Sequence, residues 1–406
     1  MFTKKFPTGF LWGTATAAHQ IEGNNKNSDW WKWEQRKDYS KNVESDEKDK
    51  YPLEPSLIAC DSYNRYEEDF DLCVKMNNNA VRISVEWARI EHKEGVFDEK
   101  EILHYKKVLK AAKDRNLKVF LTLQHFTLPL WLSEKGGWAN VSTPKYFSRY
   151  AKKCAQEFGE LVDSFLTINE PQVYIYMSYT KGTWPPNKRN PFLGILVQFN
   201  MIFGHRKAYS SIKSVSNKYS VGIVKNIVWE YASEDKHFLK ILDVLVAKIM
   251  YWFSSGFLFS LLKGRLDLIG LNYYFTNRIK NLKLANVDDK LSDLGWWIHP
   301  KGLENVLLTL KKYNLPIYIT ENGVADKDDR LRKDFIEEML VSCHNAIEKG
   351  VKLKGYFHWS LLDNYEWQQG FWPRFGLIEI DRENNLKRKM RPSALYYGEI
   401  CKKNAV

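Results

Sequence analysis

Eight short apolar runs recur along the chain, and the segments between most of them have the composition and period of helices. The runs are residues 9–17, 80–85, 118–124, 164–168, 221–228, 266–274, 316–320 and 354–360. Continuous apolar strands separated by helical segments, such as 98–116 and 333–350, are typical of a parallel sheet with both faces buried. Eight such units predict an α/β protein with a single (β/α)8 barrel.

The main alternative is an open doubly wound sheet. Such a sheet should carry a glycine-rich phosphate-binding turn after its first strand, but the first run, GTATA, is followed by AHQIEG. No linker or low-complexity segment divides the 406 residues, of which 44% are hydrophobic. We therefore expect one domain over residues 1–406, large enough to bury a substantial core.

The net charge of +12 raises the question of a polyanionic partner. The lysines are spread along the chain, and the one tight basic cluster, at 387–391, lies close to acidic residues at 381–383. No nucleic-acid recognition motif accompanies the charge. We expect a solvated basic surface and no nucleic-acid partner.

The most apolar stretch, residues 249–262, contains Ser-Ser-Gly and is shorter than the roughly 20 residues that cross a bilayer. It predicts two buried helical turns, with an exposed apolar lip as the alternative, and no membrane span. The first residues, MFTKKFPTGFLWG, have Pro7 and Gly9 where a signal peptide needs an unbroken apolar run. We therefore expect a cytoplasmic protein.

Polar and aromatic side chains follow the predicted strands at their carboxyl ends, which meet at one mouth of a barrel. They are Gln20, Glu22, Arg82, His125, Asn169, Glu170, Asn272, Tyr273, Tyr274, Glu321, Asn322 and Trp359. Sugar hydroxyls need polar partners, and sugar ring faces pack on aromatic rings. This mixture therefore predicts a sugar-binding mouth.

Two of these residues are carboxylic acids from opposite parts of the barrel, Glu170 after the fourth strand and Glu321 after the seventh. Glycosidic-bond cleavage requires such a pair, because one carboxyl protonates the departing oxygen and the other meets the developing positive charge. Either residue alone could equally cap a helix or pair with a neighbouring cation. Together at one mouth they favour a glycosidase.

The sequence resembles the retaining β-glycosidases of glycoside hydrolase family one. The matching segments are FLWGTATAAHQIEG, RISVEWARI, TINEP, LIGLNYY, YITENG, HWSLLDNYEW, RFGL and RPSALYY. This resemblance extends from Phe10 to Tyr397. It implies a (β/α)8 barrel with a general acid/base on the fourth strand and a nucleophile on the seventh.

Position by position, the resemblance implies that Glu170 is the acid/base and that Asn169 holds the sugar 2-hydroxyl. Glu321 matches the nucleophile, and Arg82 and Tyr274 match its hydrogen-bond donors. The expected substrate-binding residues are Gln20, His125, Asn272, Trp296, Trp359, Glu366, Trp367 and Phe375. Among them Trp359 matches the stacking platform and Trp296 an aromatic on the aglycone side.

Residue types at these positions distinguish related activities. Relatives that act on 6-phosphorylated sugars replace the Glu366–Trp367 pair, and thioglucosidases replace the acid/base with Gln, so an O-linked β-glycoside is expected. The family usually has Trp-Asp-Leu-Pro after the histidine, whereas this chain has Phe126-Thr127-Leu128-Pro129. That change removes an indole N–H donor from the expected sugar site.

The sequence thus predicts a retaining exo-β-glycosidase, most simply a β-glucosidase that also accepts galactosides or fucosides. A transglycosylase would use the same two carboxylates, and a catalytically silent sugar-binding barrel would need neither. The nine histidines show no metal-binding spacing such as H-E-x-x-H, and no nucleotide loop is visible. We expect no metal and no cofactor.

Overall fold

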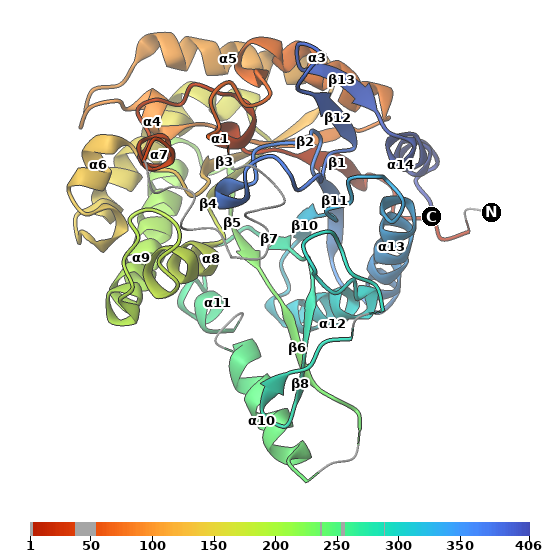
Figure 1. Cartoon of the computed structure of the whole chain (residues 1–406). Helices are drawn as coiled ribbons and strands as arrows, with labels where there is room; N and C mark the ends of the chain where they lie inside the picture. The colour runs from red at the N-terminus through yellow and green to blue at the C-terminus, as the bar shows by residue number, and fades with distance from the viewer. Residues whose placement is uncertain (1–2, 37–53, 236–237, 253–255, 288) are drawn as a thin grey trace.

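A closed parallel barrel forms the centre of the protein. The computed structural model describes residues 3–36, 54–235, 238–252, 256–287 and 289–406. Within them eight parallel strands close in the order β1-β11-β10-β7-β5-β4-β3-β2, and helices surround them (Figure 1). The strands are β1 (Leu11–Ala15), β2 (Ala80–Ser84), β3 (Lys118–Gln124), β4 (Ser164–Asn169), β5 (Ser220–Asn226), β7 (Leu268–Asn272), β10 (Ile317–Asn322) and β11 (Leu353–Trp359). Each overlaps one predicted apolar run, which confirms the (β/α)8 barrel.

The barrel interior is filled by apolar side chains that alternate along the strands with others facing the helices. Phe120, Leu166, Val224 and Phe357 belong to this inner cluster and are essentially unexposed. A Cβ atom on Gly13 would lie 2.7 Å from the Phe357 ring, so glycine is required where that ring meets β1. The strands are therefore buried on both faces, which explains their continuous apolar sequences.

The helices of the chain lie outside the barrel strands, and most of them pack on the barrel by an apolar stripe. They are α1 (Ala18–Ile21), α2 (Asp29–Glu34), α3 (Ser62–Lys75), α4 (Trp87–Ile90), α5 (Glu99–Asp114), α6 (Leu130–Glu134), α7 (Thr143–Phe158), α8 (Pro171–Ile175), α9 (Pro191–Val215), α10 (Lys240–Tyr251), α11 (Phe257–Leu261), α12 (Pro300–Leu310), α13 (Arg332–Glu348) and α14 (Pro392–Lys403). In α7 the buried Phe147, Ala151, Cys154 and Phe158 recur at helical spacing. Such stripes fix which face of each helix meets the strands.

Two small sheets extend the barrel. β12 (Ile378–Asp381) and β13 (Lys387–Met390) form an antiparallel pair, while β6 (Trp229–Ala232), β8 (Thr276–Lys280) and β9 (Lys283–Leu284) form a second sheet. Figure 1 shows β6, β8 and α10 standing out beyond the ring of helices as an extension.

Where the structure describes it, the apolar stretch 249–262 is only partly buried, so the prediction of two buried turns is wrong around the end of α10. Ile249, Met250 and Trp252 are exposed, whereas Leu258 and Phe259 of α11 are buried. The exposed residues lie on the extension, away from the core that would have covered them. Among the described residues no helix has the length and apolarity needed to cross a membrane.

Candidate active site

A cavity of about 610 Å³ opens at the carboxyl ends of the barrel strands. Eleven of the thirteen predicted site residues line it: Gln20, His125, Asn169, Glu170, Tyr274, Trp296, Glu321, Trp359, Glu366, Trp367 and Phe375. Arg82 and Asn272 are completely buried and lie behind this wall, where they contact residues that form it. The direct substrate contact expected of Asn272 is therefore replaced by support of Glu170.

The segment LTINEP places Glu170 at the turn between a strand and a helix. Asn169 ends β4, Glu170 adopts a left-handed backbone conformation (φ 44°), and Pro171 is the first residue of α8. Proline suits this first helical position because it has no N–H to leave unpaired and its φ is already helical. The turn thus directs a carboxyl group from the strand end to the cavity wall.

Burial and a neighbouring negative charge favour the neutral form of Glu170, and together they outweigh the two amide donors that favour its charged form. Burial, followed by the negative charge of Glu321, raises its pKa to about 8. Asn272 and Asn226 each donate from Nδ2 to Glu170 Oε1, at 2.7 and 3.0 Å. At neutral pH Glu170 therefore holds a proton that it can donate.

Glu321 has the opposite surroundings. Arg82, a buried arginine from β2, forms an ion pair with its Oε1, and the Tyr274 hydroxyl donates to its Oε2 at 2.5 Å. Both groups stabilise negative charge on this carboxylate. Gly323 follows closely, and a Cβ there would collide with the Trp359 carbonyl oxygen, so the glycine lets β10 and β11 approach at this point.

Arg82 also links the two halves of the site. Its Nη2 donates to Asn169 Oδ1 at 2.7 Å, which fixes the orientation of that amide. Asn169 Nδ2 then lies 3.2 Å from His125 Nε2 and donates to it. Burial and the charge of Arg82 hold the His125 pKa well below its usual value, so the ring is neutral and carries its hydrogen on Nδ1.

Two polar atoms without protein partners indicate where a ligand would bind, on the side of the cavity that contains His125 and Gln20. His125 Nδ1 and Gln20 Oε1 are buried and have no hydrogen-bond partner among the described residues. Gln20 Nε2 is engaged with the Tyr365 carbonyl at 2.8 Å and with Glu366 Oε2 at 3.3 Å. One donor and one acceptor are thus available to a ligand's hydroxyl groups.

Aromatic rings form the remaining walls. The rings of Trp359 and Trp367 each lie about 6 Å from the His125 ring and nearly parallel to it. At the other side, Trp296 contacts Tyr274 and Phe375, with ring centroids 5.5 and 6.1 Å apart. The cavity therefore combines polar groups on one side with an aromatic cluster on the other, an arrangement suited to a sugar and its aglycone.

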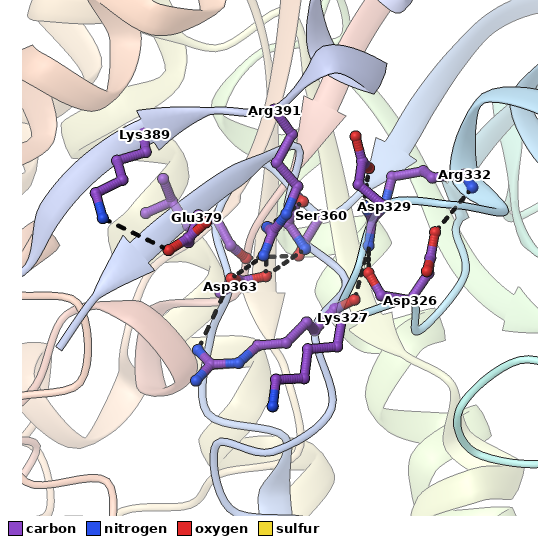
Figure 2. Close-up of polar contacts among 12 residues, drawn as sticks. Asp326, Lys327, Asp329, Arg332, Ser360, Asp363, Glu379, Lys389 and Arg391 are labelled. Atoms are coloured by element: carbon purple, nitrogen blue, oxygen red, sulfur yellow. Dashed lines mark hydrogen bonds and ion pairs between the residues drawn. The ribbon is translucent and has the colours of Figure 1, made fainter.

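The loop that carries Glu366 and Trp367 is held by a buried ion pair (Figure 2). Arg391 donates to both oxygens of Asp363, at 3.0 and 2.9 Å, and to the Gly376 carbonyl at 2.8 Å. The Gly376 amide in turn donates to Asp363 Oδ1. Arg391 immediately precedes α14, so the C-terminal helix anchors one wall of the cavity.

Sequence reasoning missed two residues of β5. Asn226 donates to Glu170, as described above, and Lys225 lines the same cavity although only 1% of it is exposed. No hydrogen bond or ion pair joins the side-chain amine of Lys225 to a described residue, and burial lowers its pKa well below the usual value. Both lie within the predicted run 221–228, and their polar side chains in an otherwise apolar run were the signal that could have identified them.

The described residues contain no group of three or more His, Cys, Asp or Glu side chains arranged to hold a metal ion. The two carboxyls carry the chemistry that the geometry of the site supports directly. One is protonated and the other is stabilised as an anion, at one cavity that contains unpaired hydrogen-bonding atoms and aromatic walls.

Comparison with known proteins agrees with this geometry. Residues 2–258 and 258–406 match the family "Glycosyl hydrolase family 1". Beta-glucosidase A of Thermotoga maritima is 30% identical over 460 residues, and the match covers all of both chains. A beta-galactosidase of Saccharolobus solfataricus is 31% identical over 491 residues, and the match covers 99% of this chain and 96% of the relative. The solved structure of a beta-glycosidase from Pyrococcus horikoshii is 35% identical in sequence and superposes with a TM-score of 0.89. The match covers all of this chain and 96% of that one. The chain therefore belongs to glycosyl hydrolase family 1 and is a glycoside hydrolase.

Proposed function

We propose that this glycoside hydrolase is a retaining exo-β-glycosidase that cleaves O-linked β-glycosides in two displacement steps. The observation that carries the proposal is the contrast between its two carboxyls, of which Glu170 is protonated and Glu321 is stabilised as an anion. When two neighbouring carboxyl groups have surroundings that favour different protonation states, one can act as the general acid and the other as the nucleophile.

In the first step a Glu321 oxygen bonds to the anomeric carbon while the glycosidic C–O bond breaks. The electron pair of that bond goes to the departing oxygen, which takes the proton of Glu170 and leaves as an alcohol. The result is a glycosyl ester on Glu321 and an ionised Glu170.

In the second step water attacks the same carbon and the ester bond breaks. Glu170 now accepts a proton from the water, and Glu321 departs as the carboxylate that Arg82 and Tyr274 stabilise. Two inversions at one carbon return the original β configuration, and both carboxyls return to their starting states.

We assign glycone recognition to the polar side of the cavity. His125 Nδ1 donates to a sugar hydroxyl, Gln20 Oε1 accepts from one, and Trp359 packs against the ring. One relative is named a beta-glucosidase and another a beta-galactosidase. Glucose and galactose differ only in the orientation of one hydroxyl group. We propose a β-glucosidase with tolerance for β-galactosides and β-fucosides.

A panel of nitrophenyl β-glycosides tests the glycone, and NMR of the first-formed sugar tests the stereochemistry. We expect the highest kcat/KM for the glucoside and a β-anomer that mutarotates only afterwards. An initial α-anomer would rule out retention.

Transfer of the sugar to an alcohol instead of water is the alternative reaction, and nothing in the structure or the comparisons favours it. The ratio of transfer product to hydrolysis product with an added alcohol acceptor measures it. The cytoplasmic location stays a prediction, and cell fractionation tests it.

A further inference from the structure

A large share of the exposed apolar side chains lies in one part of the molecule. Half of the exposed large apolar residues among those described fall between positions 192 and 252. On α9 they form a stripe at helical spacing, Phe192, Ile195, Phe199 and Phe203, and Phe192 is 84% exposed. Scattered exposed apolar residues are ordinary, but a cluster on one surface indicates an interaction site.

The stripe continues from α9 onto the extension. The Phe199 ring lies 6.4 Å from that of Phe257 at the start of α11, and Phe257 lies 5.7 Å from Trp252, the residue after α10. On α10 the exposed Ile241, Leu245 and Ile249 recur at helical spacing, with Ile241 83% exposed. We call the exposed apolar residues of α9 and α10, with Phe257 and Trp252, the apolar face. Figure 1 shows α11 between the two helices.

The same part of the chain is strongly basic. Between positions 171 and 229 the sequence contains no Asp or Glu, although it contains eight Lys and Arg residues. On α10 the only acid is Asp243, which is buried and accepts from the Asn281 and Leu282 amides. Residues 171–229 therefore carry +8 of the formal net charge of +12, because acids are absent there and not because Lys and Arg are denser than elsewhere.

Basic side chains border the apolar face directly. Phe203 shares a surface hollow of about 430 Å³ with Arg206, Lys207 and Arg265, together with Ser148, Ser210 and Ser211. Lys207, Lys248 and Lys263 are exposed and form no ion pair with any described residue. Apolar side chains bordered by unpaired cations and serine hydroxyls are suited to a surface with anionic headgroups above an apolar layer.

We propose that the apolar face and its basic border bind the surface of a membrane containing anionic phospholipids. The apolar side chains insert at the boundary between headgroups and acyl chains, and the cations contact lipid phosphates. The protein lies on the bilayer without crossing it, as the absence of a spanning helix in the described residues requires.

A second copy of the chain fits this surface less well. Pairing the same face of two copies about a two-fold axis would bring Lys207, Lys248 and Lys263 of one copy close to those of the other. Like charges opposed at an interface are unfavourable, whereas an anionic bilayer satisfies the apolar and basic groups at once. The charge therefore distinguishes the two occupants.

Sedimentation with vesicles tests the proposal. We expect the wild-type protein to bind vesicles of phosphatidylcholine with about one third phosphatidylglycerol, to bind pure phosphatidylcholine at least about tenfold more weakly, and to be released by salt. The triple variant Ile241→Gln, Leu245→Gln, Ile249→Gln and the variant Lys207→Glu, Lys248→Glu, Lys263→Glu should each lose at least about tenfold in binding. Both variants should hydrolyse a soluble aryl glycoside at the wild-type rate, and this activity serves as the control that they fold.

Matched controls remove exposed apolar or basic residues elsewhere. The variant Leu103→Gln, Val141→Gln, Leu395→Gln changes residues of similar exposure on other helices and loops, and Lys75→Glu, Lys100→Glu, Lys402→Glu makes the same charge change there. Both should bind anionic vesicles as the wild type does. Wild-type protein that binds neither vesicle, or controls that lose binding as much as the test variants, would overturn the proposal. So would a concentration-dependent dimer in analytical ultracentrifugation that the Ile241, Leu245 and Ile249 variant abolishes, because the face would then belong to a second copy.

Discussion

Glu170 and Glu321 carry the same functional group, but the nearest charge differs in sign. Glu170 has the carboxylate of Glu321 as its principal charged neighbour and receives only neutral amide donors, whereas Glu321 has the guanidinium of Arg82 against it. In a buried site such differences in neighbouring charge favour different roles for two acids. The roles therefore follow from neighbours that lie far away in the sequence.

Replacing the nucleophile tests the assignment of Glu321. We expect Glu321→Ala to lower kcat by a factor on the order of 10⁴ or more, because no group remains to form the glycosyl ester. Added azide should restore part of the turnover from the vacated side and yield the α-glycosyl azide, detectable by NMR. The surface change Glu379→Ala serves as the control. An alanine variant with near-normal activity would contradict the assignment.

Replacing the acid should separate good from poor leaving groups. We expect Glu170→Gln to cost about 10²–10⁴-fold on alkyl glycosides, whose leaving oxygen must be protonated. An activated aryl glycoside should show a burst of phenol, since the first step is spared and the second lacks its base. The wild-type kcat/KM should fall as pH rises through about 8, where Glu170 loses its proton, and this fall should flatten in the variant. Equal slowing on both substrate types with an unchanged pH profile would show that Glu170 only positions the sugar.

The buried amine of Lys225 should lower the stability of the folded state. Its amine is buried without an ion pair or hydrogen bond to the described residues, so Lys225→Met should raise the free energy of unfolding by about 1–3 kcal/mol. The folded state binds fewer protons than the unfolded state below the ordinary lysine pKa of 10.5, so wild-type stability from this group rises with pH and the advantage of the variant shrinks toward pH 10. Urea denaturation at pH 6 and 9 measures both effects. The exposed Lys218→Met is the control, with a change below about 0.5 kcal/mol.

At the scale of elements, strand ends supply the catalytic groups and long loops supply the rest of the cavity. The pairing of β4 and β10 with their neighbouring strands positions Glu170 and Glu321 at the mouth of the barrel. Glu366 and Trp367 instead lie on the loop after β11, which depends on the Asp363–Arg391 pair for its position (Figure 2). The sugar-binding side is therefore only as stable as this buried ion pair.

Removing one partner of that pair should destabilise the protein strongly. We expect Arg391→Met to lower the free energy of unfolding by about 3–5 kcal/mol, because Asp363 stays buried without its counter-ion. The double variant Asp363→Leu, Arg391→Met should recover part of the loss, since no unpaired charge remains. Thermal denaturation and KM for the aryl glycoside measure the effects on the fold and the loop. Equal losses in the single and double variants would show that packing, rather than unpaired charge, is responsible.

At the scale of the whole molecule, the two ends of the described chain meet on one side of the barrel (Figure 1). The Lys4 amide donates to the Val406 carbonyl at 2.9 Å, and Trp12 Nε1 donates to Asn404 Oδ1 at 2.9 Å. Since β1 pairs with both β2 and β11, the barrel closes only when the first and last strands are in place. Stability should therefore be shared by the entire barrel.

Unfolding should accordingly be one cooperative event. We expect a single transition in differential scanning calorimetry, and we expect deletion of residues 392–406 to prevent folding, because it removes α14 and the contacts of both ends. The point variant Lys402→Ala, exposed on the same helix, should leave the transition unchanged. Two resolved transitions in the intact chain would contradict the expectation of one domain.

The resemblance to the family supplied Trp296, Glu366, Trp367 and Phe375 of the cavity wall, whereas the pattern of the sequence by itself determined the eight strands, their closure into a barrel and the other seven predicted residues of that wall. It could do so because continuous apolar runs must be buried on both faces, and because parallel strands bring their carboxyl ends to one mouth. Only the tertiary structure decided that Asn272 and Asn226 support Glu170, that Lys225 lines the cavity and that Ile249, Met250 and Trp252 are exposed. These outcomes depend on which elements pack against a side chain, and no local pattern of residues specifies contacts between segments so far apart in the chain.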